Sequence, residues 1–286
     1  AWSGVFHAIS AFNNAGFSIH ADGLVRYATD GVVLLPIMLA IVIGGLGLPV
    51  LHDLRNKPGD PHHWSVHTKL TLLGTGILLA GGALTLLAFE WSNPMTLGPM
   101  TAPDKLLSAL FASVSARTAG FNSIDIGGLT HESLGLHYFL MFIGGGSAGT
   151  AGGVKVGTAM ILALLVIAEI RGRTDTEAFG RRISLSSQRQ AITVLVLGSA
   201  MVVLGTLFIL RTTDIATDKV IFEVISAFGT VGLSTGITAE LPESAQLMLA
   251  LLMYVGRVGT ITLAASLALG EHRMPYRYPE EHPVVG

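Results

Sequence analysis

Apolar stretches long enough to cross a lipid bilayer recur along this chain. A helix needs about 20 apolar residues to span the hydrocarbon core. The segments that approach or exceed this length are residues 31–51, 70–89, 154–170, 191–210 and 246–269. Only 13% of the residues are charged, whereas soluble domains carry about 25%. The sequence therefore predicts an all-α integral membrane protein.

Lysine and arginine are distributed unevenly between the two ends of these spans. Ten of them lie on one side, in residues 52–69, 171–189 and 271–286, and five lie on the other side, which is rich in Asp and Glu. Because cytoplasmic loops carry an excess of Lys and Arg, the first side is predicted to be cytoplasmic. The acidic side then faces outward, where it raises the local concentration of cations.

A short motif occurs three times on the outward side: FNNAGFS from residue 12, RTAGFNS from residue 117 and GTVGLST from residue 229. Each copy follows a Ser-Ala pair at the end of an apolar segment of about a dozen residues, which is too short to span a membrane. Such self-similarity marks a repeat architecture. We expect each unit to contain a span, a re-entrant helix with the motif, and a second span.

The boundaries of the expected units follow from the spans and motifs. A partial unit covers residues 1–51, a second unit residues 69–170 and a third residues 191–270, with cytoplasmic loops at residues 52–68 and 171–190 and a cytoplasmic tail at residues 271–286. The first unit lacks its leading span, which indicates a fragment or a trimmed chain.

The glycines of the three motifs have a physical rationale. Non-helical backbone at membrane depth has to line water or be buried in protein, because lipid cannot satisfy its peptide groups. Glycine permits backbone angles that point successive carbonyls the same way, and a ring of carbonyl oxygens can replace the hydration shell of a potassium ion. The alternative is that small residues only let helices pack closely. Three copies after similar helices favour an ion filter.

The motifs SAFNNAGFS, SARTAGFNS and SAFGTVGLS closely resemble filter loops two, three and four of the Trk/Ktr/HKT superfamily of potassium-uptake proteins, and Ktr-like members most of all. The resemblance covers essentially the whole chain. It implies M1-P-M2 units (helix, re-entrant pore helix with filter loop, helix) around a central, potassium-channel-like pore, of which units two to four of four are present here. The implied filter residues are Asn14, Ala15, Gly16, Thr118, Ala119, Gly120, Thr230, Val231 and Gly232.

A glycine-rich tract at residues 144–153 interrupts the predicted unit of residues 69–170. Its glycines are Gly144, Gly145, Gly146, Gly149, Gly152 and Gly153. A continuous helix is disfavoured by so many glycines, and the Walker pattern of phosphate-binding loops is absent because Lys155 stands between two valines. The resemblance implies an intramembrane gating loop with Lys155 near the pore. The alternative is that Lys155 extends to the cytoplasmic surface.

Arg257 lies within the last predicted span, and a charge at that depth has to face a cavity or a partner. The resemblance places it on the pore wall below the filter, as an electrostatic barrier that contacts the gating loop. The alternative is a structural anchor. The family commonly has a proline shortly after this arginine, whereas this chain reads Gly259-Thr260, which puts the local helix bend in question.

Other classes of function find little support in the sequence. Cysteine is absent, and His62, His63 and His67 form a predicted solvated cluster without a carboxylate at ligand spacing. We expect no enzyme, no resident cofactor or metal beyond transported K⁺, and no nucleic-acid partner. Glu223 is expected to form hydrogen bonds behind the third motif.

The resulting functional hypothesis is potassium uptake across the plasma membrane, with the filter mouth outward and Na⁺ as a second candidate ion. The resemblance implies a homodimer of pore subunits in the lipid bilayer, controlled by a cytoplasmic ring of nucleotide-binding (RCK-type) regulatory proteins. The alternative is a sodium-coupled secondary transporter of another solute, built from broken helices.

Overall fold

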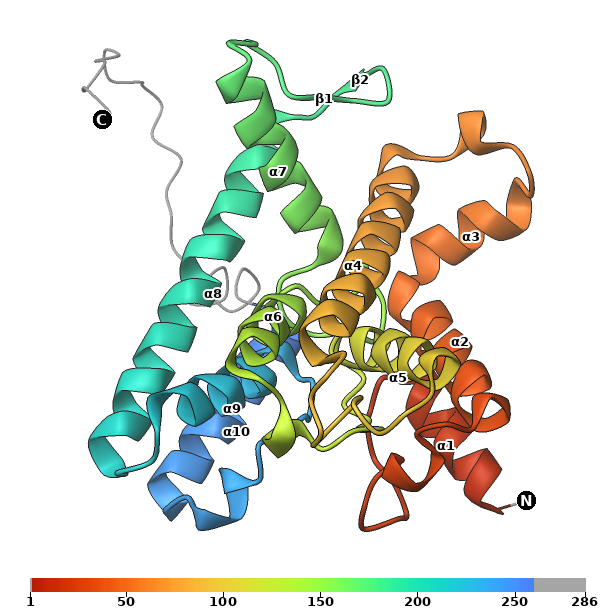
Figure 1. Cartoon of the computed structure of the whole chain (residues 1–286). Coiled ribbons are helices and arrows are strands. Elements are labelled where there is room, and N and C mark those ends of the chain that lie inside the picture. Colours follow the sequence, from red (N-terminus) through yellow and green to blue (C-terminus); the bar gives the residue numbers. More distant parts are fainter. Residues whose placement is uncertain (1, 260–286) are drawn as a thin grey trace.

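The computed structural model describes residues 2–259, and these residues form a largely helical protein (Figure 1). The helices are α1 (Trp2–Phe12), α2 (Gly31–Leu46), α3 (Leu48–Asn56), α4 (Val66–Glu90), α5 (Ala102–Ser115), α6 (His131–Phe142), α7 (Val156–Ile170), α8 (Leu185–Thr212), α9 (Thr217–Gly229) and α10 (Glu243–Val258). A two-residue hairpin, β1 (Glu177–Ala178) and β2 (Arg181–Arg182), connects α7 to α8. Short 3-10 turns lie at Val25–Tyr27, Pro61–His63, Ile126–Gly128 and Ile237–Glu240.

Two of the described helices, α4 and α8, are long and apolar enough to cross a membrane. A third candidate is the pair α2 and α3, which meet at an angle of 100°. The span expected over residues 31–51 is divided between these two helices. The helix breaks at Gly47, whose φ of +92° is accessible to glycine and costly for other residues.

The last predicted span, residues 246–269, is covered in part. Helix α10 occupies Glu243–Val258 and is followed by Gly259. The remaining residues of that span, the end of the expected third unit and the expected tail at residues 271–286 lie outside the described part of the chain.

The helices that precede the three glycine motifs are short, and the later two are largely buried, whereas the first exposes apolar side chains such as Trp2 and Ile9. They are α1, α5 and α9, with 11, 14 and 13 residues. Every residue of α9 from Phe222 to Gly229 is buried. By contrast, only 17% of the most apolar window of α8 is buried, so the apolar side chains of α8 face outward, as those of a lipid-facing helix do.

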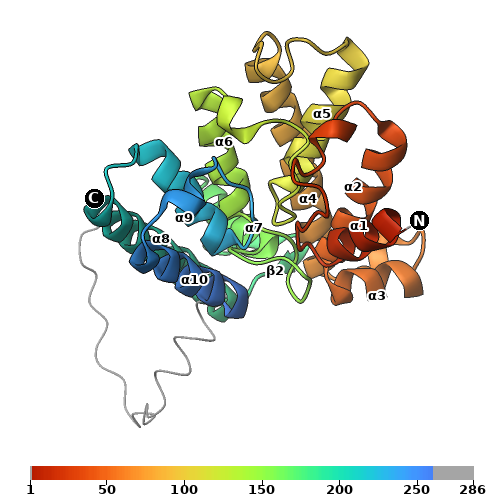
Figure 2. The same cartoon turned by 90° about the horizontal axis from the view of Figure 1, so that it is seen from below.

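The elements follow one another around the molecule in chain order. Figure 2 shows α1 to α3 and α8 to α10 on opposite sides, with α6 and α7 between them. Helix α2 contacts α5, α4 contacts α5, α6 and α7, and α6 contacts α9, which packs against α8 and α10. This order brings the C-terminal ends of α1, α5 and α9 toward a common centre.

Side chains anchor the polar connections between helices. Asp53 of α3 accepts hydrogen bonds from the Ser65 amide (3.1 Å), the Ser65 hydroxyl (2.7 Å) and the Thr68 hydroxyl (2.6 Å). These donors stabilise the charged carboxylate and lower the pKa of Asp53 to about 2. The same contacts fix the start of α4, where Ser65 caps the helix.

The connection between α7 and α8 is more ordered than a free loop at residues 171–190. Helix α8 already begins at Leu185, because Ser184 accepts a hydrogen bond from the amide of Ser187 and caps it. In the hairpin, Arg182 pairs with Asp175 at 2.8 Å.

Candidate functional site

Each glycine motif is held against its preceding helix by the serine of the Ser-Ala pair. The hydroxyl of Ser10 donates to the carbonyl of Phe17 at 2.9 Å, that of Ser115 to Phe121, and that of Ser226 to Leu233 at 2.6 Å. In every case the acceptor is the residue after the motif glycine. The repeated Ser-Ala spacing therefore has a structural reason, which is to fix the loop behind its glycine.

The backbone of the three loops adopts one conformation. Its φ angles are positive at the motif glycines, Gly16 (+71°), Gly120 (+76°) and Gly232 (+92°). They are also positive two residues earlier, at Asn14 (+50°), Thr118 (+70°) and Thr230 (+52°), whereas the intervening residues keep negative φ. Positive φ is uncommon outside glycine and costs about 1–3 kcal/mol unless the surroundings enforce it. Because it occurs at the equivalent position of all three loops, we infer that the surrounding structure enforces this backbone geometry.

The three loops lie side by side. A Cβ atom added to Gly16 would lie 2.5 Å from the carbonyl oxygen of Ala119, and one added to Gly120 would lie 2.0 Å from that of Val231. The side-chain amide of Asn14 also contacts the hydroxyl of Thr118 at 3.2 Å. The structure thus brings together all nine residues that the sequence assigned to the filter, in the order first, second, third loop.

The C-terminal ends of three helices point to this group of loops. Helix α1 ends at Phe12, α5 at Ser115 and α9 at Gly229, each directly before its loop. A helix C-terminus carries partial negative charge from its unpaired carbonyls. The arrangement accordingly favours a cation next to the loops.

The glycine tract crosses from α2 to α10 alongside the second and third loops. Its backbone amides donate to carbonyls of both helices: Gly146 to Gly45 (2.7 Å), Thr150 to Gly44 (3.4 Å) and Gly153 to Gly256 (3.2 Å). The tract is also tightly packed. A Cβ on Gly144 would lie 2.2 Å from the carbonyl oxygen of Gly152, and one on Gly152 would lie 2.1 Å from the hydroxyl of Thr230. Side chains at these positions would push the tract away from the loops.

Lys155 and Arg257 both bind the tract through backbone carbonyls. The Lys155 ammonium donates to the carbonyl of Ala151, and the side chain is half-buried. Arg257, in the last turn of α10, donates from Nη1 to the carbonyl of Thr150 and is otherwise exposed. All gating candidates from the sequence therefore belong to one connected group.

The sequence of this chain matches a known family. The sequence profile of TrkH, described as "Cation transport protein", matches residues 1–272. The chain belongs to the TrkH family.

Relatives within and around the TrkH family are similar over the whole chain. It is 40% identical to "Ktr system potassium uptake protein B" of Bacillus subtilis over 286 residues, and 38% identical to "Potassium/sodium uptake protein NtpJ" of Enterococcus hirae over 291 residues. All of this chain is covered in both comparisons, but only 64% of either relative. The chain thus spans slightly less than two thirds of the length of these proteins.

A solved structure shares the fold. The crystal structure of the potassium transporter TrkH from Vibrio parahaemolyticus superposes with a TM-score of 0.75 at 20% sequence identity, covering 92% of this chain and 57% of that chain. The predicted helical membrane architecture agrees with this fold and with the TrkH family.

Two features of the site were not predicted from the sequence. The first is a further repeat, IGGLG at residues 43–47, IGGGS at residues 143–147 and VGRVG at residues 255–259. Gly44 and Gly256 occupy equivalent places, because a Cβ on either would lie 1.8 Å from the carbonyl oxygen of Phe12 or Phe228. Aligning the segments that follow each motif could have revealed this repeat.

The second missed feature is Arg117. Its side chain is only 6% exposed, and Nη2 donates to the carbonyl of Gly144 at 3.1 Å. The sequence signal was available, since an arginine stands here where the other two motifs have Phe12 and Phe228. Arg117 ties the second loop to the start of the glycine tract.

The remaining polar candidates are structural. As expected, Glu223 is buried behind the third loop, where it accepts hydrogen bonds from the amide of Thr235 (3.1 Å) and the hydroxyl of Thr238 (3.0 Å). The predicted solvated histidine cluster is correct for His62 and His63, which are exposed, but wrong for His67, which is half-buried. His63 also has a carboxylate partner, Asp60. Within residues 2–259 no group of three His, Cys, Asp or Glu side chains could hold a metal ion.

Proposed function

We propose that this protein takes up potassium across the cell membrane through a filter of backbone carbonyls formed by the three glycine loops. The observation that carries the proposal is the shared backbone conformation of three adjacent loops, each fixed by its serine. Carbonyl rings of this kind select and conduct potassium. The names of the relatives from Bacillus subtilis and Enterococcus hirae support K⁺ as the ion, and the latter adds Na⁺ as a second ion.

We further propose that the glycine tract gates this pathway. It contacts Thr118 and Thr230, two residues before the motif glycines, and its hydrogen bonds connect it to α2 and α10. Arg257 holds it through Thr150 and adds a fixed positive charge that opposes a passing cation. Withdrawal of the tract would then open the path.

We also propose an assembly and a location for this protein. The pore subunit forms a homodimer in the plasma membrane, with the glycine loops facing outward, and a cytoplasmic ring of nucleotide-binding subunits controls the tract. The word "system" in the name of the Bacillus subtilis relative supports a partnership with other components.

The test compares Gly120→Ser with Gly232→Ser in the full-length protein reconstituted in liposomes, with competitive rubidium uptake as the measurement. A side chain at Gly120 would meet the Val231 carbonyl at 2.0 Å, whereas one at Gly232 finds no atom closer than 3.9 Å. We expect both variants to lose K⁺/Na⁺ discrimination, and Gly120→Ser to lose more.

Unchanged selectivity in both variants, with normal amounts of inserted protein, would rule out the filter. Rubidium uptake that requires an inward sodium gradient would instead favour the alternative, a sodium-coupled secondary transporter.

A further inference from the structure

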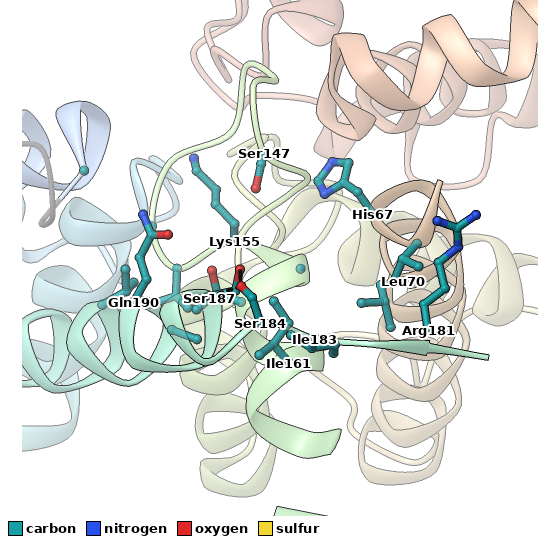
Figure 3. Close-up of a pocket in the computed structure, with 18 of the residues that line it drawn as sticks. His67, Leu70, Ser147, Lys155, Ile161, Arg181, Ile183, Ser184, Ser187 and Gln190 are labelled. Atoms are coloured by element: carbon teal, nitrogen blue, oxygen red, sulfur yellow. Dashed lines mark hydrogen bonds between the residues drawn. The ribbon is translucent and has the colours of Figure 1, made fainter. Parts of the chain in front are cut away.

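A cavity of about 560 Å³ lies beside the end of the glycine tract, on the side of the molecule that carries the hairpin. Helices α4, α7 and α8 and strand β2 contribute to its wall. Figure 3 shows Lys155 and Gln190 on one side of the cavity, His67 and Arg181 on the other, and Ser184 and Ser187 between them. None of the three motif glycines lines the cavity, but Ser147, Gly153 and Lys155 do, so the cavity borders the proposed gate.

The charges around this cavity are of one sign. Among the described residues 2–259, Lys155, Arg181 and Arg182 line it, and no Asp or Glu does. Arg182 is paired with Asp175, but Arg181 has no carboxylate within salt-bridge distance among residues 2–259. Cationic side chains that share a cavity without carboxylates repel one another and favour an anionic occupant.

Unused hydrogen-bond donors open onto the same cavity. Helix α7 begins here, and its N-cap residue, Lys155, provides no side-chain cap. The amides of Gly157 and Thr158, which line the cavity, have no acceptor within the described chain. Free amides at a helix N-terminus suit a phosphate group, because the helix dipole adds positive potential.

Apolar side chains also line the cavity, namely Leu70, Ile161, Ile183 and Val194. Beyond it, α8 exposes further apolar side chains, including Leu195 and Val196. A ligand that carries both a phosphate group and an apolar body would match this mixed lining.

We propose that this cavity binds the phosphate group of an anionic ligand, and the apolar wall favours a phospholipid head group over a soluble phosphate compound. The occupant would contact Lys155 and hence the end of the glycine tract. Binding of this ligand does not depend on potassium uptake and is tested separately from it.

The test measures lipid retention by native mass spectrometry of the purified full-length protein in detergent, with phosphatidylglycerol and phosphatidylcholine as probes. Arg181→Gln removes the unpaired cation, and Arg173→Gln is the matched control, an exposed arginine of the same connection that does not line the cavity. We expect the wild type to prefer phosphatidylglycerol, and Arg181→Gln to bind it about fivefold more weakly, the effect of one basic residue facing an anionic lipid. Arg173→Gln should bind as the wild type does.

A second variant protects the test against misfolding. Thr158→Glu places a carboxylate in the first turn of α7, which should stabilise the helix while repelling a phosphate. We expect it to lose the preference for phosphatidylglycerol with an unchanged melting temperature.

The source of the phosphate is tested by adding inorganic phosphate or ADP. Displacement of phosphatidylglycerol by these compounds, or their binding without any lipid preference, would assign the site to a soluble phosphate compound. Equal retention of both lipids by the wild type together with no binding of phosphate or ADP, or wild-type binding by both Arg181→Gln and Thr158→Glu, would refute the site.

Discussion

Ser226→Ala is the substitution that most directly tests how the glycine loops are held. The hydroxyl of Ser226 donates to the Leu233 carbonyl at 2.6 Å and accepts from the Gly232 amide at 3.2 Å, and the side chain is 2% exposed. Alanine would leave a buried donor and a buried acceptor without this partner. Such a loss costs about 1–3 kcal/mol, which would shift the balance between the ordered loop and displaced conformations by roughly 5- to 150-fold.

Ser108→Ala is the matched control for this experiment. Ser108 is fully buried in α5 and donates to a single carbonyl, that of Ala28, at 2.7 Å, away from the glycine loops. We expect both variants to lower the melting temperature of the full-length protein, because each loses a buried hydrogen bond. Only Ser226→Ala should reduce K⁺/Na⁺ discrimination, by about tenfold, in competitive rubidium uptake normalised to inserted protein. Unchanged selectivity in Ser226→Ala, or an equal loss in Ser108→Ala, would contradict the reasoning.

Three further outcomes are expected. Deleting residues 147–150 removes the part of the glycine tract that binds Gly44 and Arg257. Ion flux should therefore rise several-fold and respond less to the cytoplasmic partner. Unchanged flux in folded protein would indicate that the tract only packs the helices together. Arg257→Gln should speed uptake per molecule with selectivity nearly intact, because the positive charge disappears while the loops stay in place; equal or lower flux at normal expression would contradict the barrier. Asp53 has a pKa lowered from 3.8 to about 2, so its stabilising effect is complete above about pH 4 and is lost as the pH falls toward 2. Asp53→Asn should therefore melt lower than the wild type at pH 7 and lose part of the acid dependence of the melting temperature, whereas equal melting curves would show that the Ser65 and Thr68 contacts contribute nothing.

Much of the helical organisation could be predicted from local sequence. Residues 70–89 and 191–210 were expected to span the membrane, and α4 and α8 contain them with a few residues added at each end. The reason is that a long apolar run has few alternatives to a helix in lipid. Their exact starts depended on capping, since Ser65 and Ser184 extend the helices beyond the apolar core.

The break between α2 and α3 at Gly47 could not be predicted from apolar length. Hydropathy runs evenly through residues 31–51 and gives no sign of a 100° bend. The bend is set by a contact from a distant part of the chain, because a Cβ at Gly47 would lie 2.2 Å from the carbonyl oxygen of Ser147. The three glycines of residues 44–47 and Pro49 permit such a turn without indicating whether it occurs.

The sequence by itself determined which residues would share a role. One pattern recurs three times along the chain: a short apolar helix, a Ser-Ala pair and a loop with a glycine. Such a repeat can be recognised without any knowledge of contacts. The family resemblance already implied that the loops are neighbours and that Arg257 contacts the glycine tract. Only the tertiary structure decided that the serines support the loops from behind, that Arg117 holds the tract, and which carbonyls the two arginines bind. The physical reason is how far apart in the sequence the interacting residues lie. Apolar length and backbone freedom are properties of a segment, whereas a hydrogen bond between Arg257 and Thr150 exists only after α10 and the tract have packed together.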